Sequence, residues 1–244
     1  MRALVKHGFV YLLSYATGRS FSEFNPALRP SQEVVYQRIF DRDLESLGLR
    51  NFYYPVGSAA NYGLLYLILR AAKTFSFRQV VELGAGQTTL LIDALRRAGI
   101  LKADTLTIEH DQNWATQIQT SVSHSVLRVR LVNSEDTYAN YEGYDFGAIA
   151  IPSDIDLLII DGPPAGDANK EYARHSAMRL LDNLDPNGFL IIVDDCERVG
   201  EVALVERIDM YLRTKGFEFC RGTIAAAKMQ SIFAARRLLG AAFF

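Results

Sequence analysis

The chain has 244 residues, of which 49% are hydrophobic and 22% are charged, and this suits a globular protein of one domain with an extension. The net charge of −2 gives no overall basic field, so we expect no nucleic-acid partner. No apolar run reaches the ~18 residues that a transmembrane segment needs. Two cysteines, Cys196 and Cys220, are too few for a disulfide framework or a metal knuckle, so we expect reduced thiols and a cytoplasmic location.

The N-terminal part is expected to be a helical extension, residues 1–55, that precedes a main domain at residues 56–244. Its first 16 residues suit an amphipathic helix that docks on the core or on a partner. A signal peptide is the alternative, but the apolar part is short and the cleavage pattern is poor. The pattern predicts a further helix over 31–47, with Ser31 as its cap, and another that starts at Ser58.

Beyond this point short apolar strands alternate with helices. Strands are predicted at 79–83, 105–109, 127–132, 156–161 and 189–194, and helices at 87–99, 111–122, 169–184 and 198–214. Such alternation indicates a parallel sheet covered on both faces. The tail has two strands in direct succession with a turn at 221–222, and so short a link allows only an antiparallel pair. The predicted fold class is an α/β three-layer sandwich, with a seven-stranded, mostly parallel sheet and a C-terminal antiparallel hairpin.

A glycine turn follows the first strand, in the sequence Glu82-Leu83-Gly84-Ala85-Gly86. A dinucleotide fingerprint needs a third glycine where this chain has Thr89. The acid-x-Gly-x-Gly pattern instead resembles motif I of the class I S-adenosylmethionine-dependent methyltransferases, whose fold is Rossmann-like. In that family the turn holds the amino-acid end of the cofactor. The resemblance implies that S-adenosylmethionine is bound here by Glu82, Gly84, Ala85, Gly86 and Thr88.

Polar residues also follow the second and third strands. Glu109 ends the second strand at a spacing that suits the hydroxyls of a ribose. His110 is a candidate for contact with the adenine face, and Asp111 is the predicted cap of the next helix. After the third strand, Ser134 and Glu135 either bond the adenine edge or belong to a solvated loop.

Three carboxylates follow the fourth and fifth strands, namely Asp161, Asp194 and Asp195. Because like charges in one crevice are costly, a divalent cation such as Mg²⁺ or Ca²⁺ would stabilise them. The alternative is that one acid binds cofactor, one caps a helix and one is solvated.

These acids, with Glu109, make residues 56–235 resemble the cation-dependent O-methyltransferases of the catechol and caffeoyl-CoA type. The resemblance implies a small-molecule hydroxyl acceptor and a metal held by Asp161, Asp194 and Asp195. The chain departs from that family where Asp195 replaces an asparagine, where Gly162-Pro163-Pro164 replaces a polar segment, and where only Lys170 stands near the place of a lysine. The Asp-Gly-Pro-Pro run resembles a broader branch of class I methyltransferases, some of which act on sugars.

The expected activity is methyl transfer from S-adenosylmethionine to a small molecule, chiefly to a hydroxyl oxygen. Asp161 is expected nearest the reacting centre, in contact with cofactor or metal, and Lys170 and His175 are candidate bases. His175 is otherwise a surface residue of a helix. A non-catalytic cofactor-binding protein is a second hypothesis. An NAD(P) oxidoreductase is a third, which the missing glycine and the terminal hairpin disfavour. The N-terminal helices and the C-terminal tail are candidate surfaces for a homodimer; for the tail, a frayed strand end and a membrane-surface contact are the alternatives.

Overall fold

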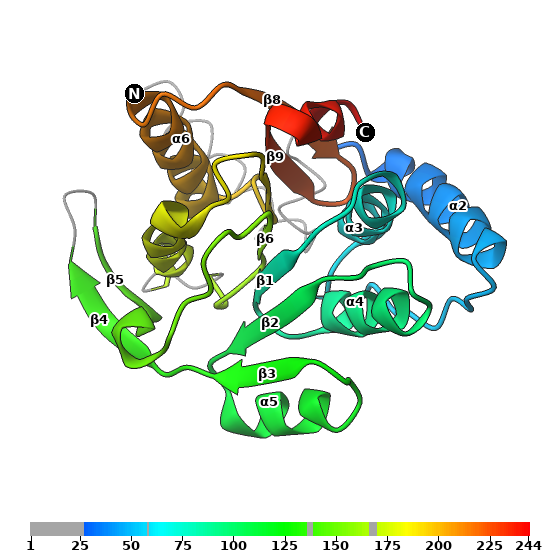
Figure 1. The fold of residues 1–244 in the computed structure, drawn as a ribbon, viewed down its shortest axis with the longest axis horizontal. Coiled ribbons are helices and arrows are strands. Elements are labelled where there is room, and N and C mark those ends of the chain that lie inside the picture. The colour runs from blue at the N-terminus through cyan, green and yellow to red at the C-terminus, as the bar shows by residue number, and fades with distance from the viewer. Residues whose placement is uncertain (1–26, 58, 136–138, 166–169) are drawn as a thin grey trace, which may run out of the picture.

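The main sheet confirms the predicted fold class. The computed structural model describes residues 27–57, 59–135, 139–165 and 170–244, and Figure 1 shows their arrangement. Seven strands pair in the order β3-β2-β1-β6-β7-β9-β8. Their bounds are β1 Gln79–Leu83, β2 Asp104–Glu109, β3 Ser125–Arg128, β6 Leu157–Ile160, β7 Leu190–Val193, β8 Phe219–Ala225 and β9 Met229–Ala235. Only β9 runs in the opposite direction to the other six strands, so every pair of neighbouring strands is parallel except the two pairs that include β9.

Helices cover both faces of this sheet, which makes three layers (Figure 1). The α-helices are α2 Pro30–Ser46, α3 Tyr62–Thr74, α4 Gln87–Arg97, α5 Gln112–Gln119 and α6 Val199–Thr214, and the 3-10 helices are η2 Phe146–Ala148, η3 Ala173–Asn183 and η4 Arg236–Phe243. Alternate strand residues enter opposite cores: Val80 and Leu157 pack with α3 and α4, whereas Val81 and Leu158 pack with η3 and α6. A strand buried on both faces has no polar alternation, which explains the uniformly apolar sequences of β6 and β7.

The predicted third strand, 127–132, is wrong in extent. The chain leaves the main sheet after β3 and forms a separate antiparallel hairpin of β4 (Leu131–Glu135) and β5 (Asn140–Tyr144). Two contacts fix the departure. The Val129 amide donates to the Glu109 carbonyl, and Arg130 pairs with Asp145 at the base of the hairpin. The segment 127–132 thus contributes to two sheets, and sequence periodicity alone does not show where such a segment is divided.

Several predicted element ends also differ from the structure. Arg29 precedes α2 without a side-chain cap, so the prediction of Ser31 as the cap is wrong. The next helix, α3, begins at Tyr62 and is capped by Asn61, while Ser58 lies outside the described residues. The segment predicted as a helix over 169–184 is 3-10 helix from Ala173 onward.

The C-terminal hairpin turns at Ala226–Lys228 and not at Arg221–Gly222. Gly222 lies inside β8, opposite Ile232, and a Cβ there would come within 2.1 Å of the Ala242 carbonyl oxygen. Gly222 therefore allows η4 to pack closely on β8. In the sequence, a glycine of this kind is easily mistaken for a turn residue.

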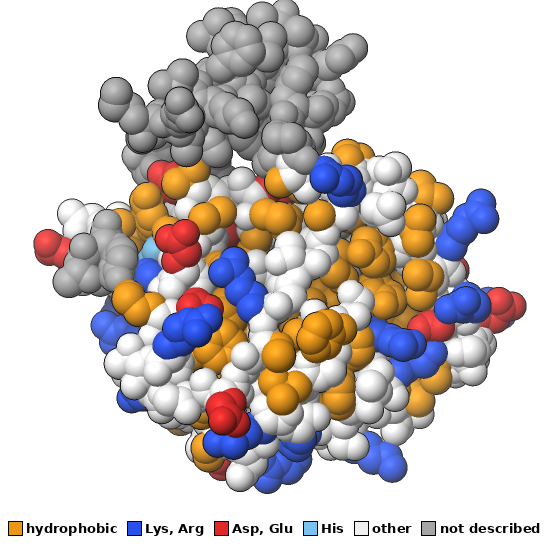
Figure 2. Space-filling view, turned by 90° about the horizontal axis from the view of Figure 1, so that it is seen from above, with side chains coloured by type: hydrophobic (Ala, Val, Ile, Leu, Met, Phe, Trp, Pro, Cys, Tyr) orange, Lys and Arg blue, Asp and Glu red, His pale blue; other side chains and the backbone are white. Residues whose placement is uncertain are grey.

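The face seen from above in Figure 2 carries hydrophobic side chains across its middle, with charged side chains around them. On η4 the exposed hydrophobic residues are Leu239 and Phe243. The homodimer expected through the tail is not tested by any contact in the structure, and the first 16 residues lie outside the described part. Among the described residues, no helix has the length and hydropathy needed to cross a membrane.

Candidate functional site

The glycine turn lies against the end of the neighbouring strand β6. Gly84 has φ +92°, and a Cβ on it would lie 3.0 Å from the carbonyl carbon and oxygen of Asp161. The Gly84 amide donates to the Ile108 carbonyl, and the Asp161 amide donates to Leu83. Only glycine accepts both the positive φ and this close approach at no cost. The turn therefore brings the ends of β1, β2 and β6 together at one edge of the sheet.

Glu109 is tied to the glycine turn. Its Oε2 accepts from the Ala85 amide at 2.9 Å, and its Oε1 accepts from the amides of His110 and Asp111. Burial opposes ionisation of this carboxyl, but these hydrogen bonds and His110 outweigh burial and lower the pKa of Glu109. An ionised Oε2 with one neighbour can still accept from a hydroxyl. Asp111 caps α5 through the Trp114 amide, as predicted.

Glu82 lies beneath the same turn and is fully buried. Its Oε2 accepts from the hydroxyls of Thr89 and Thr107 at 2.7 Å each, and the Thr89 oxygen accepts from the Gly86 amide. Burial, which outweighs the hydrogen bonds from neighbouring threonines, raises the pKa of Glu82 to about 7. Its Oε1 has no hydrogen-bond partner among the described residues. A buried carboxylate oxygen without a donor can accept a hydrogen bond from the ammonium group of S-adenosylmethionine, so the residues at the turn fit this cofactor.

Two contacts at the turn were not expected from the sequence. The indole of Trp114 donates to the Ala85 carbonyl at 2.7 Å while 40% of the residue stays exposed. The side chain of Gln87 bonds both backbone groups of Tyr54, which places the 51–57 loop beside the start of α4. The contact of Trp114 could have been predicted from its position, because it lies in the first turn of the helix that Asp111 caps.

The predicted residues Ser134, Glu135 and Lys170 lie together at the β4–β5 hairpin: Ser134 and Glu135 are on β4, and Lys170 belongs to the segment before η3. They line a hollow of about 700 Å³ with Asn133, Asn140 and others of that hairpin. Since β4 does not belong to the main sheet, its end is not aligned with the ends of β1 and β2. No residue of the glycine turn is among those that line this hollow.

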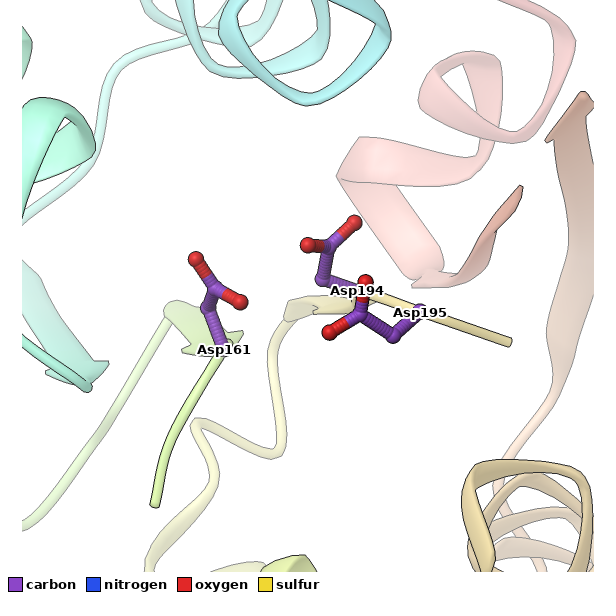
Figure 3. Close-up of side chains that lie close together, drawn as sticks. All are labelled: Asp161, Asp194 and Asp195. Carbon is purple, nitrogen blue, oxygen red and sulfur yellow. The ribbon is translucent and has the colours of Figure 1, made fainter. Parts of the chain in front are cut away.

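The three predicted carboxylates do converge, as Figure 3 shows. Oxygen atoms of Asp161, Asp194 and Asp195, at the ends of β6 and β7, lie within 4.8 Å of one another. Two cations separate them. The guanidinium of Arg174 lies 3.3 Å from Asp161 and 2.8 Å from Asp195, and the ammonium of Lys228 lies 3.4 Å from Asp194 and 3.1 Å from Asp195.

Further donors complete this cluster. Arg198 pairs with Asp195 at 2.9 Å, and the Gln230 amide donates to Asp194 at 2.6 Å. Arg174 also donates to the carbonyl oxygens of Asp161 and Asp194. Arg174, Lys228 and Gln230 were not predicted from the sequence, because none of them belongs to a strand-end motif.

Charge and burial set the protonation of the acids. Burial and the neighbouring Asp194 raise the pKa of Asp161 well above its ordinary value, against the opposing effect of Arg174 and Lys228. Burial acts in the same direction on Asp195, but Arg174, Lys228 and Arg198 outweigh it and lower the pKa of that carboxyl. Of Asp161 and Asp195, Asp161 is therefore the carboxyl that holds a proton more readily.

The residues present do not fit a divalent cation. The argument for a metal was that the carboxylates lacked opposite charge, and here Arg174, Lys228 and Arg198 supply it. A cation among these oxygens would have to displace Arg174, which is 4% exposed, or Lys228. We therefore derive no chemical step through a metal.

His175 is buried, so its interpretation as a surface residue is wrong. Its Nε2 lies 3.0 Å from the Gly200 carbonyl, and its Nδ1 lies 2.6 Å from Arg207. Because both of its ring nitrogens have partners on α6, His175 connects η3 to α6, and we do not assign it as a base.

Residues 81–196 match a family model described as a methyltransferase domain, which is 116 of the 244 residues. The matched segment contains the glycine turn, Glu109 and the three carboxylates. No curated protein matches the chain. The chain is similar to a methyltransferase from Pyrococcus furiosus (16% identity, TM-score 0.45, covering 84% of this chain and 99% of that one) and to M. jannaschii TYW2 in complex with AdoMet (14%, 0.42, 71% and 74%).

Over residues 81–196, the chain is therefore similar to methyltransferase domains. Neither the family match nor these structures support the catechol and caffeoyl-CoA type in particular.

The expectation of no nucleic-acid partner is corrected. A further similar structure is the hMettl16 catalytic domain in complex with MAT2A 3'UTR hairpin 6 (12% identity, TM-score 0.43, covering 86% of this chain and 83% of that one). Net charge was a poor ground for the exclusion, because −2 is a sum over the whole chain and says nothing about the charge of one face.

Proposed function

We propose that the chain transfers a methyl group from S-adenosylmethionine to a hydroxyl oxygen of a small-molecule acceptor, without a metal, and that Asp161 accepts the hydroxyl proton. The observation that carries the proposal is the contact between Gly84 and Asp161, because it joins the cofactor turn to the carboxylate cluster. Asp161 is 15% exposed at its side chain, whereas Asp195 is 2% exposed. Of these two acids, Asp161 is the better placed to meet an acceptor.

Residues of the turn would hold the cofactor. Oε1 of Glu82 would accept from the ammonium group, and Oε2 of Glu109 would accept from a ribose hydroxyl, while His110 and Trp114 lie beside the same turn. When bound, S-adenosylmethionine supplies a methyl group already activated by the sulfonium. The protein's own work is then to place the acceptor in line and to remove its proton.

The raised pKa of Asp161 suits this role. A general base works best when its pKa lies near the working pH, and an ordinary aspartate is too acidic for that. Here burial and Asp194 raise the pKa of Asp161, while Arg174 and Lys228 act in the opposite direction. The acceptor proton would pass to the Asp161 carboxylate as the oxygen–methyl bond forms and the sulfur–methyl bond breaks.

Release of S-adenosylhomocysteine, measured over a panel of catechols, sugars and small carboxylates, tests the proposal. A separate arm with an RNA hairpin covers the other acceptor class. Asp161→Asn should lower kcat by about 10²- to 10⁴-fold, the usual contribution of a general base, and keep the affinity for S-adenosylhomocysteine. The exposed Asp104→Asn is the matched control.

The result expected is turnover of a hydroxyl acceptor that persists in a chelator. Turnover of RNA alone would overturn the small-molecule proposal. Wild-type rates in Asp161→Asn would overturn the role of that carboxylate.

A further inference from the structure

The N-terminal helix α2 reaches the candidate site through one side chain, that of Glu33. Glu33 is in the first turn of α2, well outside the segment that matches the methyltransferase family. Its Oε2 accepts from the Asn61 side chain at 2.8 Å and from the Ala227 amide at 3.2 Å, and its Oε1 accepts from the Tyr62 amide at 2.5 Å. One carboxylate therefore joins α2, the start of α3 and the β8–β9 turn.

The β8–β9 turn carries Lys228 into the carboxylate cluster. The turn is closed by a hydrogen bond from the Ala226 amide to the Lys228 carbonyl, and Arg29, the residue before α2, binds it again where its amide donates to the Ala226 carbonyl. From this turn the Lys228 ammonium reaches Asp194 and Asp195 with only 12% of its side chain exposed. A long, flexible side chain keeps such a position only if its backbone is fixed.

A second route runs from Glu33 to the same cluster. Asn61, which Glu33 binds through its Nδ2, accepts with its Oδ1 from Gln230 at 2.9 Å. Gln230 in turn donates to Asp194 at 2.6 Å. Both routes end on Asp194, one through Lys228 and one through Gln230.

We propose that Glu33 is a positioning residue for the acceptor side of the site: it fixes the β8–β9 turn and Asn61, and thereby holds Lys228 and Asp194 against Asp161. The proposal rests on the proposed function in one respect, namely that Asp161 is the base. It makes the N-terminal helix a working part of the site. The contacts of Glu82 and Glu109 in the cofactor half do not pass through Glu33.

Lysine labelling tests the position of Lys228 without any acceptor. The wild type and Glu33→Gln are treated with an amine-acylating ester, and the rate at each lysine is read by mass spectrometry. Lys215, whose side chain is 49% exposed, is the reference for the reactivity of the reagent. Lys73, which pairs with Asp43, reports any general loosening of the packing between α2 and α3. Glu45→Gln, exposed on the same helix, is the matched control.

We expect Lys228 in the wild type to react about tenfold more slowly than Lys215, because only 12% of its side chain is exposed, whereas that of Lys215 is half exposed. Glu33→Gln should speed the reaction of Lys228 several-fold, leave Lys73 and Lys215 unchanged, and leave the affinity for S-adenosylhomocysteine within twofold. Unchanged labelling of Lys228 in Glu33→Gln would overturn the proposal. Equal acceleration at Lys228 and Lys73 would also overturn it, since that is loss of structure and not of position.

A pH profile supplies the readout at Asp161. Because Lys228 helps to hold down the pKa of Asp161, Glu33→Gln should move the acidic limb of kcat to higher pH. Lys228→Met should do the same, and the double variant should add little to either. An unmoved limb in Glu33→Gln would refute the coupling. A wild type that methylates no acceptor would count against the proposed function alone, because the labelling result does not depend on turnover.

Discussion

Removal of Arg174 is the sharpest test of how the carboxylate cluster is held together. This side chain is 4% exposed and contacts Asp161, Asp195 and Glu201 as well as carbonyl oxygens. Arg174→Met keeps much of the volume and removes the charge. Taking one partner from a buried ion pair costs about 3–5 kcal/mol, because the remaining charges stay buried. For a chain of this size that corresponds to a fall in Tm of roughly 6–20 °C.

Thermal and urea unfolding measure this loss, with Arg198→Met as the control. Arg198 also pairs with Asp195, but its side chain is 34% exposed, so its removal should cost about 1 kcal/mol or less. Mg²⁺ or Ca²⁺ should raise the Tm of Arg174→Met and leave that of the wild type unchanged, because only the variant leaves the acids short of positive charge. An Arg174→Met protein that melts within a degree of the wild type would refute the ion-pair account of the cluster.

The loss of stability in Arg174→Met should also depend on pH, in a direction that the ion pairs predict. In the wild type, Arg174 is the chief cause that lowers the pKa of Asp195 against burial, and the resulting stability is lost as pH falls through that pKa. Without Arg174, the acids of the folded variant take up protons at higher pH. The stability gap between wild type and Arg174→Met should therefore narrow as the pH is lowered from 8 to 5. A gap that widens would contradict this.

Three smaller predictions concern the glycine turn. Gly84→Ala should cost at least about 1–2 kcal/mol for its positive φ, with further loss from contact with Asp161, and urea unfolding with no change in midpoint would contradict this. Burial raises the pKa of Glu82 from an ordinary 4.5 to about 7, so the folded wild type loses stability as the pH rises through this range. The stability of Glu82→Gln relative to the wild type should therefore rise with pH between 4.5 and 7, and a constant difference would refute this. Trp114 is the single tryptophan, so its fluorescence should change when S-adenosylhomocysteine binds, and unchanged emission at calorimetric saturation would place the ligand elsewhere.

Local spacing was enough to predict that the glycine turn and Glu109 lie together. The strand, the Gly-x-Gly turn and the helix start lie within about ten residues, and Glu109 follows one βα unit later. In a parallel sheet, consecutive strand ends must meet at one edge, so residues after β1, β2, β6 and β7 were expected together. Asp111 as a helix cap was likewise predictable from a contact within one helical turn.

The cationic half was not predictable, because its partners come from distant parts of the chain. Arg174 is in a 3-10 helix that was predicted as an α-helix, and Lys228 is on a turn that was assigned several residues too early. Glu33 and the Ala227 amide it accepts from are separated by 194 positions. No sequence motif marks such contacts, and without them the acids were interpreted as a metal site.

Isothermal titration of S-adenosylhomocysteine tests the central claim, that the glycine turn and Glu109 form one nucleoside site. The wild type should bind the ligand, and Glu109→Ala should bind it roughly 10- to 150-fold more weakly, the usual loss for a hydrogen bond to a charged group. Glu45→Ala on the exposed face of α2 should bind like the wild type. Absence of binding by the wild type, or equal affinity of wild type and Glu109→Ala, would contradict the account.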